Sequence, residues 1–169
     1  DLDLALAEWV KSMQYRRSDF GGGRGLSLFV YGSVGGGKTV AVARAAIRGV
    51  LDNYARDLTW IREWDLITAA KSMYGDDEKK HSALLKKVKT ADLLVIDELF
   101  TRPDAYTEHA SVVLGDALAQ RFEAKLPTLM TSNEPPIFGA VFDQRVMSRF
   151  EQVAKTVQVV GPDLRQAQV

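Results

Sequence analysis

The chain has 169 residues, and its 22 basic side chains balance its 22 acidic ones, so the formal net charge is zero. This length suits one domain with a substantial core, and the balanced charge excludes an overall field that attracts nucleic acid or a membrane; any such contact must come from a local patch. The lack of cysteine excludes a disulfide framework and a thiolate zinc site, and no apolar run approaches the ~20 residues of a membrane span. We therefore expect a cytoplasmic protein that does not contact membranes.

The first predicted element is a loosely amphipathic helix over residues 1–17, and a glycine-rich segment at 21–25 separates it from the next element. The apolar stretch LSLFVY at 26–31 predicts a strand, and TVAVARAAIRGVL at 39–51 predicts a helix. A short glycine-rich turn joins the two. This order of strand, turn and helix is the context that a phosphate-binding loop requires.

The turn GSVGGGKT at 32–39 fits the phosphate-binding pattern G-x-x-x-x-G-K-[ST] at every fixed position. Its backbone N–H groups can point inward toward phosphate oxygens, and the start of the following helix adds partial positive charge. Lys38 can then reach the β- and γ-phosphates, and the Thr39 hydroxyl can ligate Mg²⁺. We therefore predict that the chain binds a nucleoside triphosphate. The expected binding residues are Gly32, Ser33, Val34, Gly35, Gly36, Gly37, Lys38, Thr39 and Val40.

The rest of the chain alternates strand and helix patterns. A lysine-rich helical region at 65–89 is broken around Gly75, and the apolar run DLLVID at 92–97 predicts a buried strand. The alternation implies an α/β fold, with a parallel sheet of about five strands and helices on both faces. The other predicted strands are 58–62, 127–133 and 156–160, and the other predicted helices are 107–125 and 139–150.

Two acidic residues, Asp97 and Glu98, end the predicted strand 92–97, where a P-loop enzyme needs a carboxylate. Asp97 would hold Mg²⁺ opposite Thr39, and Glu98 would orient the attacking water or accept its proton. An isolated acidic pair would instead be solvated at the strand end, but the phosphate loop favours the functional interpretation. No Asn-Lys-x-Asp string occurs, which favours an ATPase over a GTPase.

Asn133 ends the next predicted strand, beside the strand of Asp97. Its amide can contact the attacking water or the γ-phosphate, and the equal alternative is an asparagine that starts the turn before Pro135. Arg145 and Arg149 are four residues apart on one helix face. They can neutralise the γ-phosphate of a neighbouring subunit, or pair with Glu151 or Asp143, and the residues alone do not separate these functions.

Lysines are concentrated in the region 65–89. They predict an electrostatic track for nucleic-acid phosphates, and the equal alternative is a solvated helix face balanced by nearby acids. We interpret Trp60 and Trp64, which flank the second strand, as packing residues rather than as a platform for stacked bases. The candidate DNA-binding lysines are Lys71, Lys79, Lys80, Lys86 and Lys87.

Taken in order, the strings GSVGGGKT, WIREWDLI, ADLLVIDELF, LMTSN, RVMSRF and GPDLR resemble the DnaC-type bacterial helicase loaders. These loaders are AAA+ ATPases of the initiator clade, related to the IstB-type transposition ATPases. The resemblance covers about residues 26–165 and implies a P-loop AAA+ domain at 21–169 with a truncated lid. Residues 1–20 are then an N-terminal helix and linker, a remnant of a missing N-terminal module or a connection to it.

The resemblance also implies a role for each matching residue. Lys38 and Thr39 take the Walker A positions and Asp97 and Glu98 the Walker B positions, while Asn133 is the sensor 1 residue. The remaining implied roles are Arg149 as the arginine finger that acts on a neighbouring subunit, Arg145 as an accessory or second candidate, Arg165 as the sensor 2 residue, and Arg102 and Tyr106 as residues that face a central pore for single-stranded DNA.

The function implied by this resemblance is that of an ATP-dependent replicative helicase loader. Such a protein hydrolyses ATP with Mg²⁺ at a subunit interface, assembles into an open ring or spiral on single-stranded DNA, and has a replicative DnaB-type helicase as its partner. Two alternatives stay open: an IstB-type ATPase acting on double-stranded DNA, and a monomeric P-loop phosphotransferase. The chain departs from the loaders in its N-terminal region, where the helicase-binding module is absent or reduced to residues 1–17, and at Phe100 and Pro103, where smaller residues are usual.

Overall fold

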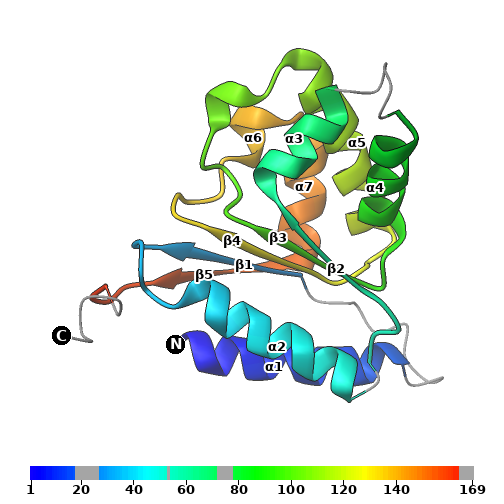
Figure 1. Ribbon diagram of the computed structural model, residues 1–169. Helices are drawn as coiled ribbons and strands as arrows, with labels where there is room; N and C mark the ends of the chain where they lie inside the picture. Colours follow the sequence, from blue (N-terminus) through cyan, green and yellow to red (C-terminus); the bar gives the residue numbers. More distant parts are fainter. Residues whose placement is uncertain (18–26, 53, 72–77, 164–169) are drawn as a thin grey trace.

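The molecule is built on one five-stranded parallel sheet (Figure 1). The computed structural model describes residues 1–17, 27–52, 54–71 and 78–163. The strand order is β2-β3-β4-β1-β5, with every neighbouring pair parallel, so the predicted α/β sheet is confirmed. The strands are β1 (Ser27–Gly32), β2 (Leu58–Arg62), β3 (Leu93–Asp97), β4 (Thr128–Ser132) and β5 (Ala154–Val159).

Helices cover both faces of the sheet (Figure 1). Side chains alternate along a strand, so Leu28 and Val30 of β1 pack toward one helical layer while Phe29 packs toward the other. The first layer holds α1 (Leu2–Arg17) and α2 (Lys38–Leu51). The second holds α3 (Glu63–Lys71), α4 (Glu78–Thr90), α5 (Glu108–Glu123), α6 (Phe138–Val141) and α7 (Gln144–Val153), with a 3₁₀ turn at Pro103–Ala105.

Helix α1 belongs to the same hydrophobic core as α2. Trp9 and Met13 are fully buried, and a Cβ atom on Gly49 of α2 would lie 3.6 Å from the Trp9 ring. An ion pair of 2.6 Å between Lys155 Nζ and Glu8 Oε2 also joins α1 to β5. The N-terminal helix is therefore packed against the sheet domain, while its connection to a further module stays a prediction.

The predicted helix at 139–150 is wrong in one respect, because the chain forms two helices there. Phe142 is extended and buried between α6 and α7, and Asp143 begins α7 as its N-cap by accepting a hydrogen bond of 3.1 Å from the Val146 N–H. That hydrogen bond is the main reason that the pKa of the Asp143 carboxyl lies below its usual value, and the Arg145 guanidinium adds to the effect. The break at Phe142 and Asp143 therefore separates α6 from α7.

A buried arginine ties the second helical layer to the sheet. Arg121 of α5 is fully buried, and its Nε donates to Thr128 Oγ1 at 2.8 Å. Its Nη atoms donate to the carbonyl oxygens of Ala91 and Pro127, each at 2.7 Å. Because these carbonyls lie just before β3 and β4, the guanidinium holds the starts of two strands against α5.

Candidate nucleotide-binding site

The turn at 32–39 has the backbone conformation of an anion-binding loop. Gly32 has φ +142°, and a Cβ atom there would lie 2.0 Å from the Val159 carbonyl oxygen, so only glycine fits beside β5. Gly37, with φ +78°, caps α2, and no side chain forms a hydrogen bond to that cap. The first turn of α2 also lacks acidic residues. The amides at the start of α2 are thus available to an anion.

The Lys38 side chain joins the phosphate loop to the end of β4. Lys38 is 7% exposed, and its Nζ donates to the Gly32 and Ser33 carbonyl oxygens at 2.8 and 2.7 Å. It also donates to Asn133 Oδ1 at 3.0 Å, so the predicted Walker A lysine and sensor residue lie together. A bound phosphate oxygen would replace one of these acceptors.

A second set of contacts joins α2 to the end of β3. The Thr39 hydroxyl donates to Asp97 Oδ1 at 3.0 Å, which places two oxygen ligands of the kind that Mg²⁺ prefers side by side. Thr131 of β4 donates to the same oxygen at 2.5 Å, and its hydroxyl accepts the Glu98 N–H at 3.0 Å. These residues fit a Mg²⁺ ion bound with nucleotide phosphates.

Thr131 is a site residue that we did not predict. It stands in the string MTSN, two residues before Asn133, and its backbone lies beside β3. The signal that could have identified Thr131 is a polar side chain on the strand that neighbours β3, the strand that ends at Asp97. Its hydroxyl, by bonding to Asp97 and Glu98 at once, sets the positions of both acidic residues.

Glu98 begins a loop with unusual backbone geometry. Its φ is +61°, in the left-handed region, which costs a residue other than glycine about 1–3 kcal/mol. The Glu98 N–H is held by the Thr131 hydroxyl, and the Leu99 N–H donates to the Thr131 carbonyl oxygen at 2.8 Å. The exposed Glu98 side chain lies at the same cleft as Lys38. The strained conformation thus occurs at a predicted catalytic residue.

A cleft of about 810 Å³ lies at these residues and is large enough for a nucleotide, although Gly32, Ser33 and Asp97 are not among the residues that line it. The cleft extends beyond the predicted residues to Leu2 and Asp3 of α1 and to Arg44 of α2. Sequence patterns did not indicate these three: Leu2 and Asp3 reach the cleft through the packing of α1 on α2, and Arg44 lies on α2 beyond the motif. The predicted residues that line the cleft are Val34, Gly35, Gly36, Gly37, Lys38, Thr39, Val40, Glu98 and Asn133.

The two predicted arginines on α7 are not among the residues that line this cleft. Arg149 Nη2 lies 3.5 Å from Glu123 Oε2, and Arg145 Nη2 lies 3.0 Å from Asp143 Oδ2. Such ion pairs at the surface contribute at most about 1 kcal/mol, so both cations are easily released. Arg165 lies outside the described residues.

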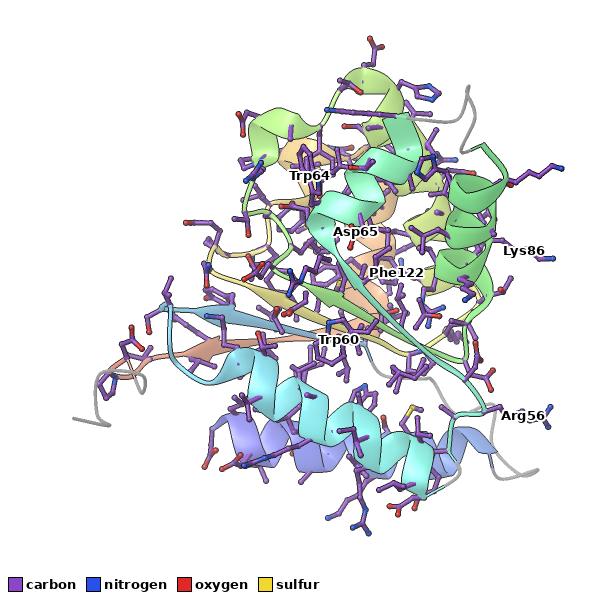
Figure 2. All side chains as sticks on the ribbon, viewed as in Figure 1. Arg56, Trp60, Trp64, Asp65, Lys86 and Phe122 are labelled. Carbon is purple, nitrogen blue, oxygen red and sulfur yellow. The ribbon has the colours of Figure 1, made fainter. Side chains whose placement is uncertain are left out.

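The predicted lysines lie away from the cleft. Lys71 ends α3, and Lys79, Lys86 and Lys87 are exposed on α4, while the side chain of Lys80 lies outside what the structure describes. Lys86 projects from α4 away from the sheet (Figure 2). Because α4 leads into the amino end of β3 and the phosphate loop follows the carboxyl end of β1, the two sites lie toward opposite ends of a parallel sheet.

Three aromatic residues differ from their predicted surroundings. Trp60 and Trp64 are 38% and 53% exposed, so our interpretation of them as packing residues is wrong. Tyr106, predicted to contact DNA, is half-buried, with its hydroxyl donating to Glu63 Oε1 at 2.8 Å and its ring 5.6 Å from that of Phe142. We therefore leave Tyr106 out of the nucleic-acid surface proposed below. Among the described helices, none combines the length and apolar character needed to cross a membrane.

Comparison with known proteins shows which solved structures share this fold. No protein-family model matches the chain, and no curated protein matches it in sequence. The chain is similar in structure to the DnaC helicase loader, with a TM-score of 0.71 and 19% identity over 93% of this chain and 87% of that chain. It is similar to domain III of the Thermotoga maritima replication initiation protein DnaA, with a TM-score of 0.70 and 19% identity over 95% and 62% of the two chains.

A third similar structure is DnaA from Aquifex aeolicus bound to AMPPCP, with a TM-score of 0.66 and 20% identity over 92% of this chain and 45% of that chain. The chain thus spans less than two thirds of either DnaA structure. At these identities the likeness concerns the fold. The chain shares the fold of these DnaC and DnaA structures, and the resemblance predicted from its sequence is confirmed at the level of that fold.

Proposed function

We propose that the chain is an ATP-hydrolysing helicase loader that acts in DNA replication. The observation that carries the proposal is a cluster of two hydrogen-bonded pairs, in which Lys38 donates to Asn133 and the neighbouring Thr39 donates to Asp97. This cluster lies in a fold that covers 87% of the DnaC helicase loader. The AMPPCP-bound DnaA structure, which has the same fold, further supports an ATP site.

In the proposed reaction, the phosphates lie over the amides at the start of α2, and Lys38 donates to their oxygens. Thr39 and Asp97 would hold Mg²⁺, and the ion would neutralise charge on the phosphate oxygens. Glu98 orients the attacking water and takes its proton, and Asn133 fixes the γ-phosphate relative to that water. The water oxygen bonds to the γ-phosphorus as the bond to the β,γ-bridging oxygen breaks, and ADP and phosphate are released.

The arginine that completes the site comes from a neighbouring subunit in this proposal. Arg149 lies on α7 of its own chain, outside the residues that line its own cleft, and is held there by a single long contact to Glu123. We expect Arg149→Ala to lower kcat for ATP about 10³-fold, as loss of an arginine finger does, with nucleotide affinity unchanged. Arg145→Ala changes the other candidate arginine on the same helix face. It should lower kcat less than Arg149→Ala does, which distinguishes the two candidates.

Mixing variants tests whether Arg149 acts between subunits. At an ATP concentration near the wild-type Kd, Lys38→Ala alone and Arg149→Ala alone should each hydrolyse ATP far more slowly than the wild type. In an equal mixture, about a quarter of the head-to-tail interfaces would combine an intact ATP cleft with an intact Arg149, so activity should return to about a quarter of the wild-type rate. A mixture that stays inactive, or an Arg149→Ala protein with full activity, would show that the arginine does not act in this way.

The loader function is tested through its partners. We expect the chain to bind single-stranded DNA more tightly than duplex in the presence of a non-hydrolysable ATP analogue, with the exposed lysines of α4 supplying salt-dependent phosphate contacts. We also expect a replicative DnaB-type helicase to co-purify with it. A preference for duplex DNA would favour the IstB-type function instead. ATPase activity per subunit that does not depend on concentration would favour a monomeric phosphotransferase.

A further inference from the structure

Glu63 is a buried acid that the proposed mechanism does not use. It is the first residue of α3, directly after β2, and it is 3% exposed. Its Oε1 accepts the Phe100 N–H at 2.6 Å and the Tyr106 hydroxyl at 2.8 Å, and its Oε2 accepts the Arg102 N–H at 3.1 Å. One carboxylate therefore holds three donors of the loop that follows Glu98, and hydrogen bonds to an ionised acceptor are the strong kind.

The loop held by Glu63 needs such a restraint. Both Glu98 and Phe100 have left-handed backbone conformations, with φ of +61° and +64°, which side chains other than glycine rarely adopt. The Phe100 ring is fully buried, with its centroid 4.9 Å from that of Phe138. Phe100, two residues after Glu98, is thus held at two points: its ring packs in the core, and its amide donates to the Glu63 carboxylate. Thr131 holds the Glu98 amide from the other side.

One further contact binds the same loop to the start of α3, and burial keeps one of the three donors protonated. Burial, with a smaller effect of the Glu63 charge, raises the pKa of Tyr106 far above its usual value, so its hydroxyl stays protonated and donates. The Arg102 guanidinium lies 5.0 Å from the centre of the Trp64 ring, a cation–π contact. Successive residues of α3, Glu63 and Trp64, therefore both hold the loop.

We propose that Glu63 is a positioning residue that keeps Glu98 in the conformation needed for ATP hydrolysis. The inference rests on the proposed ATPase function. Glu63 is not among the residues that line the cleft, and the phosphate-binding loop and Lys38 do not contact it through any hydrogen bond among those described. Loss of the carboxylate frees the amides of Phe100 and Arg102 and lets Glu98 leave its left-handed conformation. Turnover then falls while ATP binding persists.

The substitution Glu63→Gln tests this role, because its amide group turns one acceptor into a donor that faces the donors of the loop. We expect kcat to fall about tenfold or more, with the Kd of a non-hydrolysable ATP analogue within about twofold of wild type. Asp65→Asn is the matched control, since it removes the same charge from an exposed position in the same helical turn. Tyr106→Phe removes one of the three donors and should lower kcat by about threefold.

A double variant separates positioning from general destabilisation. If Glu63 acts through Glu98, then Glu63→Gln should not lower the residual rate of a Glu98→Gln protein any further. An additive loss, an equal loss of ATP affinity, or a Glu63→Gln kcat equal to wild type would overturn the proposal.

Amide hydrogen exchange gives a test that does not depend on turnover. Glu63→Gln should lose protection at the Phe100 amide or the Arg102 amide, whichever faces the new NH₂ group, while the amides of β3 stay protected. If the wild-type protein hydrolyses no ATP, the proposed function fails, and exchange then decides whether Glu63 holds the loop. Unchanged protection at these two amides would refute the role of Glu63 in either case.

Discussion

Replacing Lys38 with alanine should lower the affinity for ATP by about 10- to 100-fold, the loss expected when a charge-assisted contact worth about 1.5–3 kcal/mol is removed. The Lys38 ammonium lies at the start of α2, where the backbone amides are uncapped and acidic residues are absent from the first turn. It is the only cation in the loop 32–39. Titration of a fluorescent ATP analogue, or calorimetry, measures the change directly.

Two measurements make that result specific. Arg48→Ala removes an exposed cation from the same helix, where Arg48 contacts Asp52 instead of the cleft, and should leave ATP affinity within about twofold of wild type. Thermal unfolding checks the fold, because Lys38→Ala also leaves the Gly32 and Ser33 carbonyls without their lysine partner. A folded Lys38→Ala protein that binds ATP as tightly as wild type would place the triphosphate elsewhere.

The second large effect is expected from Glu98→Gln, which should lower kcat by about 10²- to 10⁴-fold and leave ATP binding nearly unchanged. The amide has almost the same shape as the carboxylate but does not accept a proton. The backbone contact from the Glu98 N–H to Thr131 is retained, so the loop after β3 keeps its support. Steady-state hydrolysis and the recovery of unhydrolysed ATP from the protein measure the two properties separately.

A neighbouring acid provides the control for this substitution. Glu134 is exposed next to Asn133 but is not among the residues that line the cleft, so Glu134→Gln makes the same change of charge nearby and should keep the wild-type kcat. Wild-type turnover in Glu98→Gln would contradict the assignment of Glu98 as the base. Loss of ATP binding in that variant would instead indicate a structural role for the carboxylate.

The parts of this protein that depend on local chemistry could be predicted from the sequence. The loop 32–39 needs glycine at Gly32 and Gly37 for reasons of backbone conformation and close packing, and both requirements are written in the motif. The apolar run before Asp97 indicated a buried strand, and β3 is buried along its whole length. Since the carboxyl ends of parallel strands meet at one edge of a sheet, Asp97 and Asn133 were expected near Lys38.

Local patterns also have limits within single elements. The hydrophobic pattern at 139–150 continues through Asp143, and the N-cap that divides α6 from α7 becomes evident only when the Val146 N–H is seen to donate to it. Trp60 has a side chain typical of buried strands, yet β2 is the edge of the sheet and leaves it exposed. Position in the sheet thus decides burial where residue type does not.

Contacts between distant segments were decided by the tertiary structure alone. Thr131 reaches Asp97 because β4 lies beside β3, and Glu63 reaches the loop after Glu98 because β2 lies on the other side of β3. Arginine is usually exposed to solvent, yet Arg121 is fully buried in this fold. Residue spacing along the chain does not encode such partners, because the strand order that brings them together results from the packing of the whole core. The sequence by itself therefore predicted the residues of the proposed nucleotide site, and only the fold determined which other side chains contact and hold them.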